Sequence, residues 1–523
     1  MKIVTAEQMR EIDRRAAAQG IATDFLMENA GRAVAVAVRQ FIDYTAGKTV
    51  LALAGPGNNG GDALVAARCL HEWGANVGVY LLSGRTGDDK NLSLIEELDI
   101  PVFYIEKDVK LTRLKKLVSS GGVVIDGILG TGKVRPLDGS FKEVLNLVNK
   151  EKAQRPALVV AAVDIPTGLN ADTGAIDPSC LQADLTVTLG MPKPGLYNFP
   201  GAEKAGKLVI ADIGIPAELS RGIQTELMTA DWARAALPAR PAGANKGSFG
   251  RVLAVVGSEN YIGAAYLACM GAARVGAGVV TLSTARSLQP ILASKLTEAT
   301  YAPLPETGKG MLPEKAAAAI LSILPYYRVL LIGCGLGQHP HTKSFIRSVL
   351  TGLPEKHPVM VLDADALNIV SEIDGWWERL PADTIVTPHA GEMARLLKIS
   401  VDEVQGNRFE ICRRAAMEWN KIVVLKGAFT IIAEPSGRAR VSDAANAGLA
   451  SAGTGDVLAG AIAGLAGQGI SPFDAASLGV YLHAAAGEMV KNELGDTGML
   501  ASDLLPVLPK TIRRLKGLHL RGE

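Results

Sequence analysis

The sequence of 523 residues has few cysteines, few aromatic side chains and almost no excess charge. Its five cysteines are Cys69, Cys180, Cys269, Cys334 and Cys412, and no two have the C-x-x-C spacing of a zinc or redox site. An odd, scattered set of this kind argues against a disulfide framework and predicts a reducing, cytoplasmic compartment. Lysine and arginine number 54 against 53 acidic residues, so we expect neither nucleic acid nor an anionic membrane as a partner.

The sequence also lacks a hydrophobic segment suited to crossing a membrane. The longest uncharged run, residues 457–473, is rich in glycine and alanine and contains Gln468, Ser471 and Pro472, which predicts a buried helix. The first twenty residues have no apolar core behind a basic start, so we do not expect a secretory signal. With 48% hydrophobic and 20% charged residues, the chain is expected to form compact domains.

What the sequence does have is a regular alternation of short apolar runs with helical patterns. Runs typical of strands buried on both faces occur at 48–55, 121–127, 157–166, 251–257, 327–335, 359–367, 383–389 and 421–427. Strands of this kind predict an α/β fold with mainly parallel sheets. No such strand occurs in the proline-containing stretch 213–250, so we place a boundary there. The prediction is two domains, residues 1–225 and 226–523.

Two glycine-rich loops in the first half resemble nucleotide-binding motifs, but each departs from its pattern. GPGNNG at 55–60 matches G-x-G-x-x-G, yet the next strand ends in Ser-Gly-Arg without the acidic residue that would bind a ribose. GILGTGK at 127–133 matches the start of a Walker A loop, but Val134 stands where the Mg²⁺-binding hydroxyl belongs. We therefore exclude an ordinary dinucleotide fingerprint and an ordinary P-loop.

Three polar loops in the first half each follow a predicted strand. They are GNNGGD at 57–62, Asp126 with GTGKVRPLDG at 130–139, and DIPTG at 164–168. Because ligands of open parallel sheets bind at the carboxyl ends of strands, these loops can converge on one crevice. Glycines let backbone amides approach a phosphate or a ribose. Each aspartate alone could be only a turn or N-cap carboxylate, but together they favour a site.

The first 215 or so residues resemble the NAD(P)H-hydrate epimerase family through GPGNNGGD, IDGILGTGKVRPLDG, DIPTGLNADTG and VTLGMPKPGLYNFPG. The resemblance implies a Rossmann-like α/β/α sandwich that interconverts the R and S forms of C6-hydrated NADH and NADPH (NADHX and NADPHX), using bound K⁺. The substrate-binding residues it implies are Asn58, Asn59, Gly60, Gly61, Asp62, Gly130, Thr131, Gly132, Lys133, Val134, Arg135, Pro136 and Asp164. The K⁺ ligands it implies are Asn59, Asp126 and Thr167.

Two positions depart from the epimerase pattern. The family usually has glycine where this chain has Ala63, and serine where it has Thr167. Threonine keeps the ligating oxygen, and an all-oxygen set suits a hard cation, so we expect the K⁺ site to survive. The C6 hydroxyl lies next to a ring nitrogen whose lone pair can expel it, and a positioned carboxyl group can carry the proton. We expect Asp164 to be this acid and base.

The second half contains one carboxylate in an otherwise small and apolar stretch, NAGLASAGTGDVLAG at 446–460. Its Gly-Thr-Gly precedes a helical pattern, so free N–H groups and the helix dipole form an anion hole for a phosphoryl group. Asp456 at this entrance can accept the proton of an attacking hydroxyl, although it could also be only a helix N-cap. Similarly, Asp365 could cap a helix, and His389 could be an ordinary loop histidine. Lys426 could be an exposed charge, but a lysine followed by glycine at the end of an apolar strand presents a point charge and open amides to phosphate oxygens.

Residues 226–510 resemble the ribokinase-like superfamily and, within it, the ADP- or ATP-dependent NAD(P)H-hydrate dehydratases. The motifs are TPHAGEM, LKG and NAGLASAGTGDVLAG. The nucleotide-binding residues implied are Lys426, Gly427, Ala428, Phe429, Thr430 and Gly455; those implied for the hydrate are Gly263, Ala264, Gly335, Gly337, His389 and Asp456. The family usually has proline where this chain has Cys334, a change that can loosen the turn containing Gly335 and Gly337.

Taken together, the two resemblances imply a bifunctional repair enzyme. The dehydratase half would phosphorylate the C6 hydroxyl of the S-hydrate and then lose phosphate, with Mg²⁺ arriving on the nucleotide. The epimerase half would recycle the R form. Domains of both kinds commonly assemble, so we expect a homo-oligomer. The alternative is a kinase of a vitamin-precursor alcohol with a non-catalytic N-terminal binding domain, against which the set Asn59, Asp126 and Thr167 argues.

Overall fold

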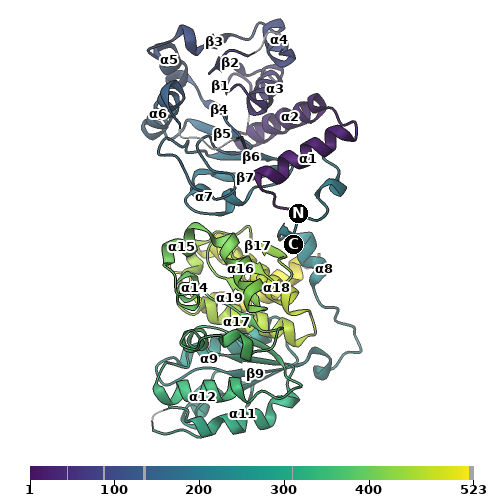
Figure 1. Cartoon of the computed structure of the whole chain (residues 1–523), viewed down its shortest axis with the longest axis vertical. Helices are drawn as coiled ribbons and strands as arrows, with labels where there is room; N and C mark the ends of the chain where they lie inside the picture. Colours follow the sequence, from purple (N-terminus) through teal and green to yellow (C-terminus); the bar gives the residue numbers. More distant parts are fainter. Residues whose placement is uncertain (44, 86–88, 133–136, 309, 518–523) are drawn as a thin grey trace. The chain divides into compact units, whose positions relative to one another are not determined.

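The chain divides into two compact units, Met1–Ile223 and Gln224–Glu523 (Figure 1). The computed structural model describes residues 1–43, 45–85, 89–132, 137–308 and 310–517. Each unit is built around one sheet with helices on both faces, and most neighbouring strands run parallel. The predicted α/β class with mainly parallel sheets is confirmed.

The first unit contains a seven-stranded parallel sheet in the order β3-β2-β1-β4-β5-β6-β7. The strands are β1 (Thr49–Ala54), β2 (Asn76–Leu81), β3 (Val102–Tyr104), β4 (Val123–Gly127), β5 (Val159–Val163), β6 (Leu185–Leu189) and β7 (Lys207–Ala211). The chain adds β2 and β3 on one side of β1, and then returns to add β4 to β7 on the other side. The strand order therefore reverses between β1 and β4, which is where open α/β sheets form a ligand crevice.

Helices cover both faces of this sheet and complete a three-layer sandwich (Figure 1). The helices are α1 (Ala6–Ala18), α2 (Thr23–Phe41), α3 (Asn58–Glu72), α4 (Lys90–Glu97), α5 (Thr112–Ser120), α6 (Gly139–Gln154) and α7 (Gly201–Lys204). Buried side chains of α2, α3 and α4 join one hydrophobic core, and those of α5 and α6 join the core on the opposite face. Helix α1 begins at a capping box made by Thr5 and Gln8 and buries Met9 and Ile12 in a separate small cluster.

The second unit contains a ten-stranded sheet in the order β11-β10-β9-β12-β13-β14-β15-β16-β17-β8. Its strands are β8 (Thr225–Leu227), β9 (Arg251–Val255), β10 (Val279–Ser283), β11 (Thr300–Tyr301), β12 (Val329–Ile332), β13 (Val359–Leu362), β14 (Ile385–Val386), β15 (Ile422–Leu425), β16 (Ile431–Ala433) and β17 (Ala439–Val441). Strands β15, β16 and β17 pair antiparallel, and the other neighbours pair parallel. The carboxyl ends of β12 to β15 therefore meet at one edge.

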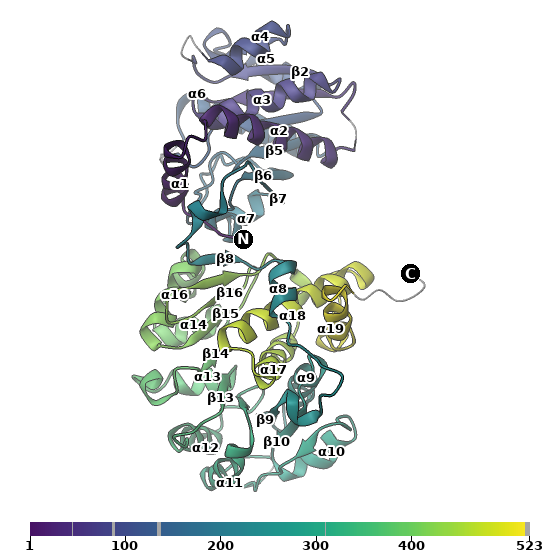
Figure 2. The ribbon, with the colours of Figure 1, turned by 90° about the vertical axis from the view of Figure 1, so that its right-hand side faces the viewer.

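Helices again lie on both faces (Figure 2). They are α8 (Ala230–Ala236), α9 (Ile262–Arg274), α10 (Gln289–Ala293), α11 (Ala317–Ile323), α12 (Pro340–Thr351), α13 (Asp365–Val370), α14 (Ala390–Leu397), α15 (Val401–Gly406), α16 (Arg408–Trp419), α17 (Thr454–Gly467), α18 (Pro472–Leu494) and α19 (Ala501–Leu515). Helix α17 packs closely against α9, because Gly460 and Gly464 have no side chain to hold the two backbones apart. The uncharged run 457–473 thus contains a buried helix, as predicted. None of the helices in the described ranges is both long and apolar enough to span a bilayer.

Candidate functional site

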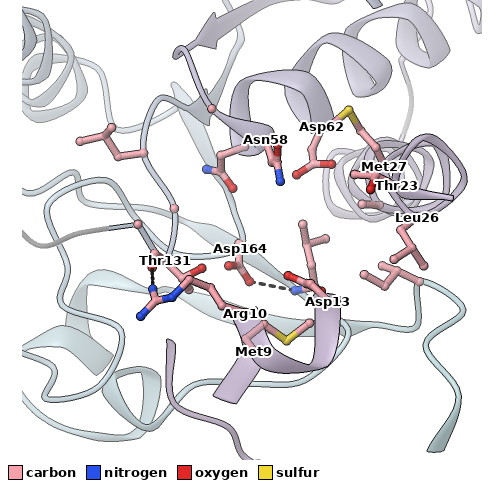
Figure 3. A pocket seen from close by; sticks show the side chains of 18 of the residues that line it. Met9, Arg10, Asp13, Thr23, Leu26, Met27, Asn58, Asp62, Thr131 and Asp164 are labelled. Atoms are coloured by element: carbon pink, nitrogen blue, oxygen red, sulfur yellow. Dashed lines mark hydrogen bonds between the residues drawn. The ribbon is translucent and has the colours of Figure 1, made fainter. Parts of the chain in front are cut away.

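A cavity of about 890 Å³ opens at the carboxyl edge of the first sheet (Figure 3). The loops after β1, β4 and β5 form one side, and residues of α1 and α2 form the other. Of the sequence-predicted residues, the cavity wall includes Asn58, Asn59, Asp62, Gly130, Thr131, Gly132 and Asp164. Gly60 and Gly61 lie in the first turn of α3, where a Cβ on Gly60 would stand 2.1 Å from the Gly55 carbonyl oxygen. Residues 133–136, which include the predicted Lys133, Val134, Arg135 and Pro136, lie outside the described residues.

Asp164 follows β5 in a backbone conformation that is rare for residues other than glycine, with φ of +66°. Its Oδ1 accepts hydrogen bonds from the Leu189 amide at 3.1 Å and the Thr188 hydroxyl at 3.2 Å. It also forms an ion pair with Lys193, whose side chain is 1% exposed. Strain of this kind persists where the surroundings over-determine it, often at functional sites. Sequence analysis missed Lys193, although it lies within the motif MPKPG.

Helix α1 brings further charged groups to this cavity. Asp13 and Arg10 line it, and the Arg10 guanidinium donates a hydrogen bond to the Thr131 carbonyl oxygen at 3.0 Å. Burial raises the pKa of Asp62 well above its ordinary value, and the negative charges of Asp164 and Asp13 raise it further. The cavity thus holds three carboxyl groups close to a single buried ammonium group, an arrangement suited to moving protons. Neither Arg10 nor Asp13 was anticipated from the sequence.

The three predicted K⁺ ligands lie together behind the cavity. Asp126 and Thr167 are fully buried, with the Thr167 hydroxyl 2.6 Å from Asp126 Oδ1 and the Thr167 amide 2.7 Å from Asp126 Oδ2. Asn59 donates its amide nitrogen to the Val163 carbonyl oxygen at 3.0 Å, so its Oδ1 stays available near Gly130. Burial raises the pKa of Asp126 to about 6, against hydrogen bonds from Thr167 that lower it. A buried carboxylate with neutral oxygen neighbours fits a hard monovalent cation.

In the second unit, Asp456 lies in the first turn of α17, after Gly453 at φ of +90°. The Cys334 thiol and the carboxylates of Asp363 and Asp456 lie with their reactive atoms within 4.8 Å of one another. The pKa of Asp456 is raised to about 7, first by burial and then by the charge of Asp363, against the charge of Lys426 and the Cys334 thiol, which lower it. The same thiol donates to Asp363 Oδ2 at 3.5 Å. A carboxyl group with a pKa near neutrality is suited to act as a general base.

Lys426 follows β15 and is anchored by acidic groups on neighbouring loops. Its Nζ lies 2.7 Å from Asp363 Oδ1 and 3.9 Å from Glu392 Oε2. Burial opposes its charge, but Asp363 and Glu392 outweigh that effect and raise the pKa of Lys426. Asp363 also accepts a hydrogen bond from the Thr387 hydroxyl at 2.6 Å. Sequence analysis included Asp363 only within the apolar run 359–367, and did not anticipate that it would hold Lys426.

Of the predicted hydrate-binding residues of the second unit, Gly263 and Ala264 lie in the first turn of α9, and Gly335 and Gly337 lie on the loop after β12. Gly335, at φ of +62°, packs so closely against α9 that a Cβ would stand 2.7 Å from the Ala264 Cβ. The Gly337 amide donates to Asp365 Oδ2 at 2.8 Å, and a Cβ on Gly263 would meet open space. In the turn at Cys334, its carbonyl oxygen accepts a hydrogen bond from the Gly257 amide at 2.9 Å.

His389 caps α14, because its Nδ1 accepts hydrogen bonds from the amides of Gly391 at 3.0 Å and Glu392 at 3.4 Å. His389 therefore has a structural role as the N-cap of α14. Its Nε2 lies 3.5 Å from Glu392 Oε1, and its side chain is 54% exposed. Burial lowers the pKa of His389, and the charge of Lys426 lowers it further, so the ring is available as a neutral hydrogen-bonding group.

A smaller cavity of about 180 Å³ lies beside Lys426, between the turn after β15 and the start of α17. Of the predicted nucleotide-binding residues, it is lined by Lys426, Gly427, Ala428, Thr430 and Gly455. Phe429 is not among the lining residues, and its amide donates to the Ala444 carbonyl oxygen at 2.9 Å. His483 also lines it, with Nε2 3.0 Å from the Thr454 carbonyl oxygen; burial lowers the pKa of His483 to about 4. Sequence analysis did not identify His483.

These two sites define a two-centre α/β enzyme, with a pocket that contains several carboxyl groups in one unit and a cavity at the start of α17 in the other. The first unit matches the family model described as YjeF-related protein N-terminus over residues 23–195, and the second matches the model for NAD(P)H-hydrate dehydratase over residues 252–510. The bifunctional NAD(P)H-hydrate repair enzyme Nnr of Moorella thermoacetica is 41% identical over 99% of this chain and 97% of its own length. That of Thermofilum pendens is 35% identical over the same shares.

The chain therefore belongs to the family of bifunctional NAD(P)H-hydrate repair enzymes. Among solved structures, an ADP/ATP-dependent NAD(P)H-hydrate dehydratase from Bacillus subtilis, co-crystallised with ATP and Mg²⁺, is 34% identical and covers 55% of this chain and 98% of its own, with a TM-score of 0.49. The full-length relatives are named as bifunctional NAD(P)H-hydrate repair enzymes. They do not favour the alternative of a vitamin-precursor kinase joined to a non-catalytic N-terminal domain.

Proposed function

We propose that this chain repairs hydrated NADH and NADPH by two reactions. The first unit interconverts the R and S hydrates, and the second dehydrates the S hydrate to NAD(P)H at the expense of ADP or ATP. The observation that carries this proposal is the similarity to bifunctional repair enzymes over 99% of the chain. Two separate acid–base centres, one around Asp164 and one around Asp456, support it because each reaction needs its own proton carrier.

In the epimerase reaction, the ring nitrogen expels the C6 hydroxyl, and water returns to either face of the planar cation. Asp164 carries the proton to the departing oxygen and accepts it again from the water that adds. Lys193 holds Asp164 in place through their ion pair and supplies a positive charge beside the oxygen that leaves. Asn58, Asp62 and the loop 130–132 bind the substrate along the cavity wall. The raised pKa of Asp62 favours its protonated form, so this group can serve as a second proton donor.

We also propose that K⁺ binds to Asn59, Asp126 and Thr167. The support is the buried Asp126 carboxylate, which among the described residues has hydrogen-bond donors but no lysine or arginine at ion-pair distance. A bound cation compensates this charge and supplies electrostatic stabilisation next to the cavity. It also fixes the side chain of Asn59, which borders the cavity through the first turn of α3.

In the dehydratase reaction, Asp456 takes the proton of the C6 hydroxyl while that oxygen attacks the terminal phosphoryl group of the nucleotide. The nucleotide departs with one phosphate fewer, phosphate then leaves C6 with the electrons of the C6–O bond, a proton is lost from C5, and the ring double bond is restored. Phosphate is a better leaving group than hydroxide, which is why a nucleotide is consumed. The free amides at the start of α17 stabilise the charge that develops on the phosphoryl oxygens.

The nucleotide would lie in the smaller cavity, against the turn from Lys426 to Thr430 and Gly455. Lys426 offers a point charge to the phosphate oxygens, and Mg²⁺ would arrive with the nucleotide. Gly263, Ala264, Gly335, Gly337 and His389 would bind the hydrated nicotinamide. We further propose that the enzyme works in the cytoplasm, in line with its five unpaired cysteines, and that it self-associates, which light scattering of the purified protein tests.

The proposal is tested by the recovery of NADH absorbance from a mixture of R and S hydrates, with ADP or ATP and with or without K⁺. Asp456→Asn should abolish dehydration and leave epimerisation intact, whereas Asp164→Asn should do the reverse. The two variants serve as matched controls for each other because both proteins contain the same two units. Failure of the unaltered enzyme to recover NADH with either nucleotide would refute the proposal.

A further inference from the structure

Arg408, the first residue of α16, is a buried cation that folding alone does not explain. Its residue surface is 4% exposed, and its Nε is buried without a hydrogen-bond partner. Within the described part of the chain no carboxylate lies within ion-pairing distance of its guanidinium, and its hydrogen-bond partners are the neutral oxygens of Gln405, Leu425 and Lys426. Burial lowers its pKa. A buried charge without a counter-ion costs several kcal/mol in general, so this residue is expected to have a role outside folding.

The place of Arg408 in its helix adds to this cost. It occupies the N-terminal turn of a twelve-residue helix, where the helix dipole is positive and disfavours a cation. Lys426, the neighbouring cation, has its own counter-charges in Asp363 and Glu392. Those carboxylates are therefore engaged by Lys426, and Arg408 keeps an uncompensated positive charge.

The guanidinium lies directly beneath the turn that follows β15. One of its nitrogens, Nη2, donates to the carbonyl oxygens of Leu425 at 3.2 Å and Lys426 at 3.4 Å. Gly427, at φ of +142°, packs on the guanidinium so closely that a Cβ would stand 3.1 Å from both Nη1 and Nη2. On its other side, this turn lines the smaller cavity. A negative charge bound in that cavity would therefore be separated from the Arg408 guanidinium by the backbone of Lys426 and Gly427.

We propose that Arg408 is a positioning residue for the phosphate groups of the nucleotide. It fixes the carbonyl groups of the turn so that the turn's amides face the cavity, and its charge is compensated only when the phosphates bind. This inference rests on the proposed function, because it takes the occupant of the smaller cavity to be a nucleoside di- or triphosphate. It predicts that Arg408 contributes to nucleotide affinity without touching the nucleotide.

The test compares Arg408→Met with the unaltered protein in two measurements, dehydration kinetics and the nucleotide-induced rise in unfolding temperature. We expect the KM for ADP and ATP to increase roughly 10- to 100-fold with kcat within about threefold, since the electrostatic attraction between the Arg408 charge and the bound phosphates is lost. The concentration of nucleotide needed for stabilisation should increase by the same factor. The nucleotide-free protein should unfold within a few degrees of the original, because the variant also removes an unpaired buried charge.

Two further variants and an internal control separate this role from a structural one. Arg408→Lys keeps the charge and should recover most of the nucleotide affinity. An affinity as low as in Arg408→Met would refute the claim that the charge at this position attracts the bound phosphates. Arg413→Met removes another arginine of α16, which donates to the Gly437 carbonyl oxygen at 3.0 Å, and should leave nucleotide affinity unchanged. Epimerisation should be unchanged in all variants. Unaltered nucleotide affinity in Arg408→Met would overturn the inference, whereas absence of nucleotide binding by the unaltered protein would overturn the proposed function itself.

Discussion

Lowering the pH from 8 to 6 should reduce the rate of dehydration about tenfold. The reason is Asp456, whose pKa is raised to about 7 by burial and, secondly, by the charge of Asp363. A general base works only as the carboxylate, and for a pKa of about 7 the ionised fraction falls from about nine-tenths at pH 8 to about one-tenth at pH 6. The activity is therefore expected to increase with pH and to level off above pH 8.

The contribution of Cys334 to this pH profile can be worked out separately. The thiol donates to Asp363 Oδ2 at 3.5 Å, and it also lies close enough to the Asp456 carboxylate to act on it as a donor and lower the pKa of Asp456. A hydrogen bond of about 0.5–1.5 kcal/mol corresponds to about 0.4 to 1 pH unit, at about 1.4 kcal/mol per unit. Cys334→Ala should move the midpoint of the profile upward by this amount. Cys334→Ser retains a donor of similar size and should keep the midpoint at or below the original value.

The assay is kcat/KM for the purified S hydrate at saturating nucleotide, followed by NADH absorbance between pH 5.5 and 9, because this parameter reports groups of the enzyme before the hydrate binds. ADP and ATP are compared so that titration of the nucleotide itself is recognised. Epimerisation is followed in the same samples as an internal control for unfolding. A dehydration rate that stays constant from pH 6 to pH 8, or increases as the pH falls, would refute the role of Asp456 as the base.

Three other changes test the remaining features of the two sites. Asp456→Asn should stabilise the protein at pH 8 by up to about 4 kcal/mol in thermal unfolding. Folding raises the pKa of Asp456 to about 7, so its ionisation destabilises the folded state increasingly as the pH rises from about 4 to 7. Equal or lower stability of the variant would contradict this. Gly130→Ala should raise the K⁺ concentration for half-maximal epimerisation roughly tenfold, since its Cβ would stand 2.9 Å from Asn59 Oδ1. Gly132→Ala, whose Cβ would have nothing within 4 Å, should leave this K⁺ concentration unchanged. Asp164→Asn should slow exchange of R and S hydrates by about 10²- to 10⁴-fold, and an exchange rate near the original would exclude it as the proton carrier.

The strand pattern was enough to predict which loops meet, but not which side chains pair. Asp126 and Thr167 are 41 residues apart and yet hydrogen bonded, as expected from two loops that follow neighbouring parallel strands. Lys193, by contrast, reaches Asp164 only because the chain turns back after β6. No periodicity in the sequence reports such a turn. The same holds for Asp13, because the hydrophobic face of α1 indicates that the helix packs, but not against which surface.

The second site shows why local motifs could not predict its electrostatics. Lys426 after an apolar strand suggested a free charge for phosphate, but tertiary packing gives it Asp363 as a partner at 2.7 Å. Asp363 also lies close to Asp456. Lys426 therefore compensates the charge of Asp363, whereas Asp456 remains difficult to ionise. Had Lys426 paired with Asp456 instead, the carboxylate would have been a weaker base at neutral pH. The basicity of Asp456 therefore depends on a three-residue arrangement drawn from the ends of β13, β15 and α17.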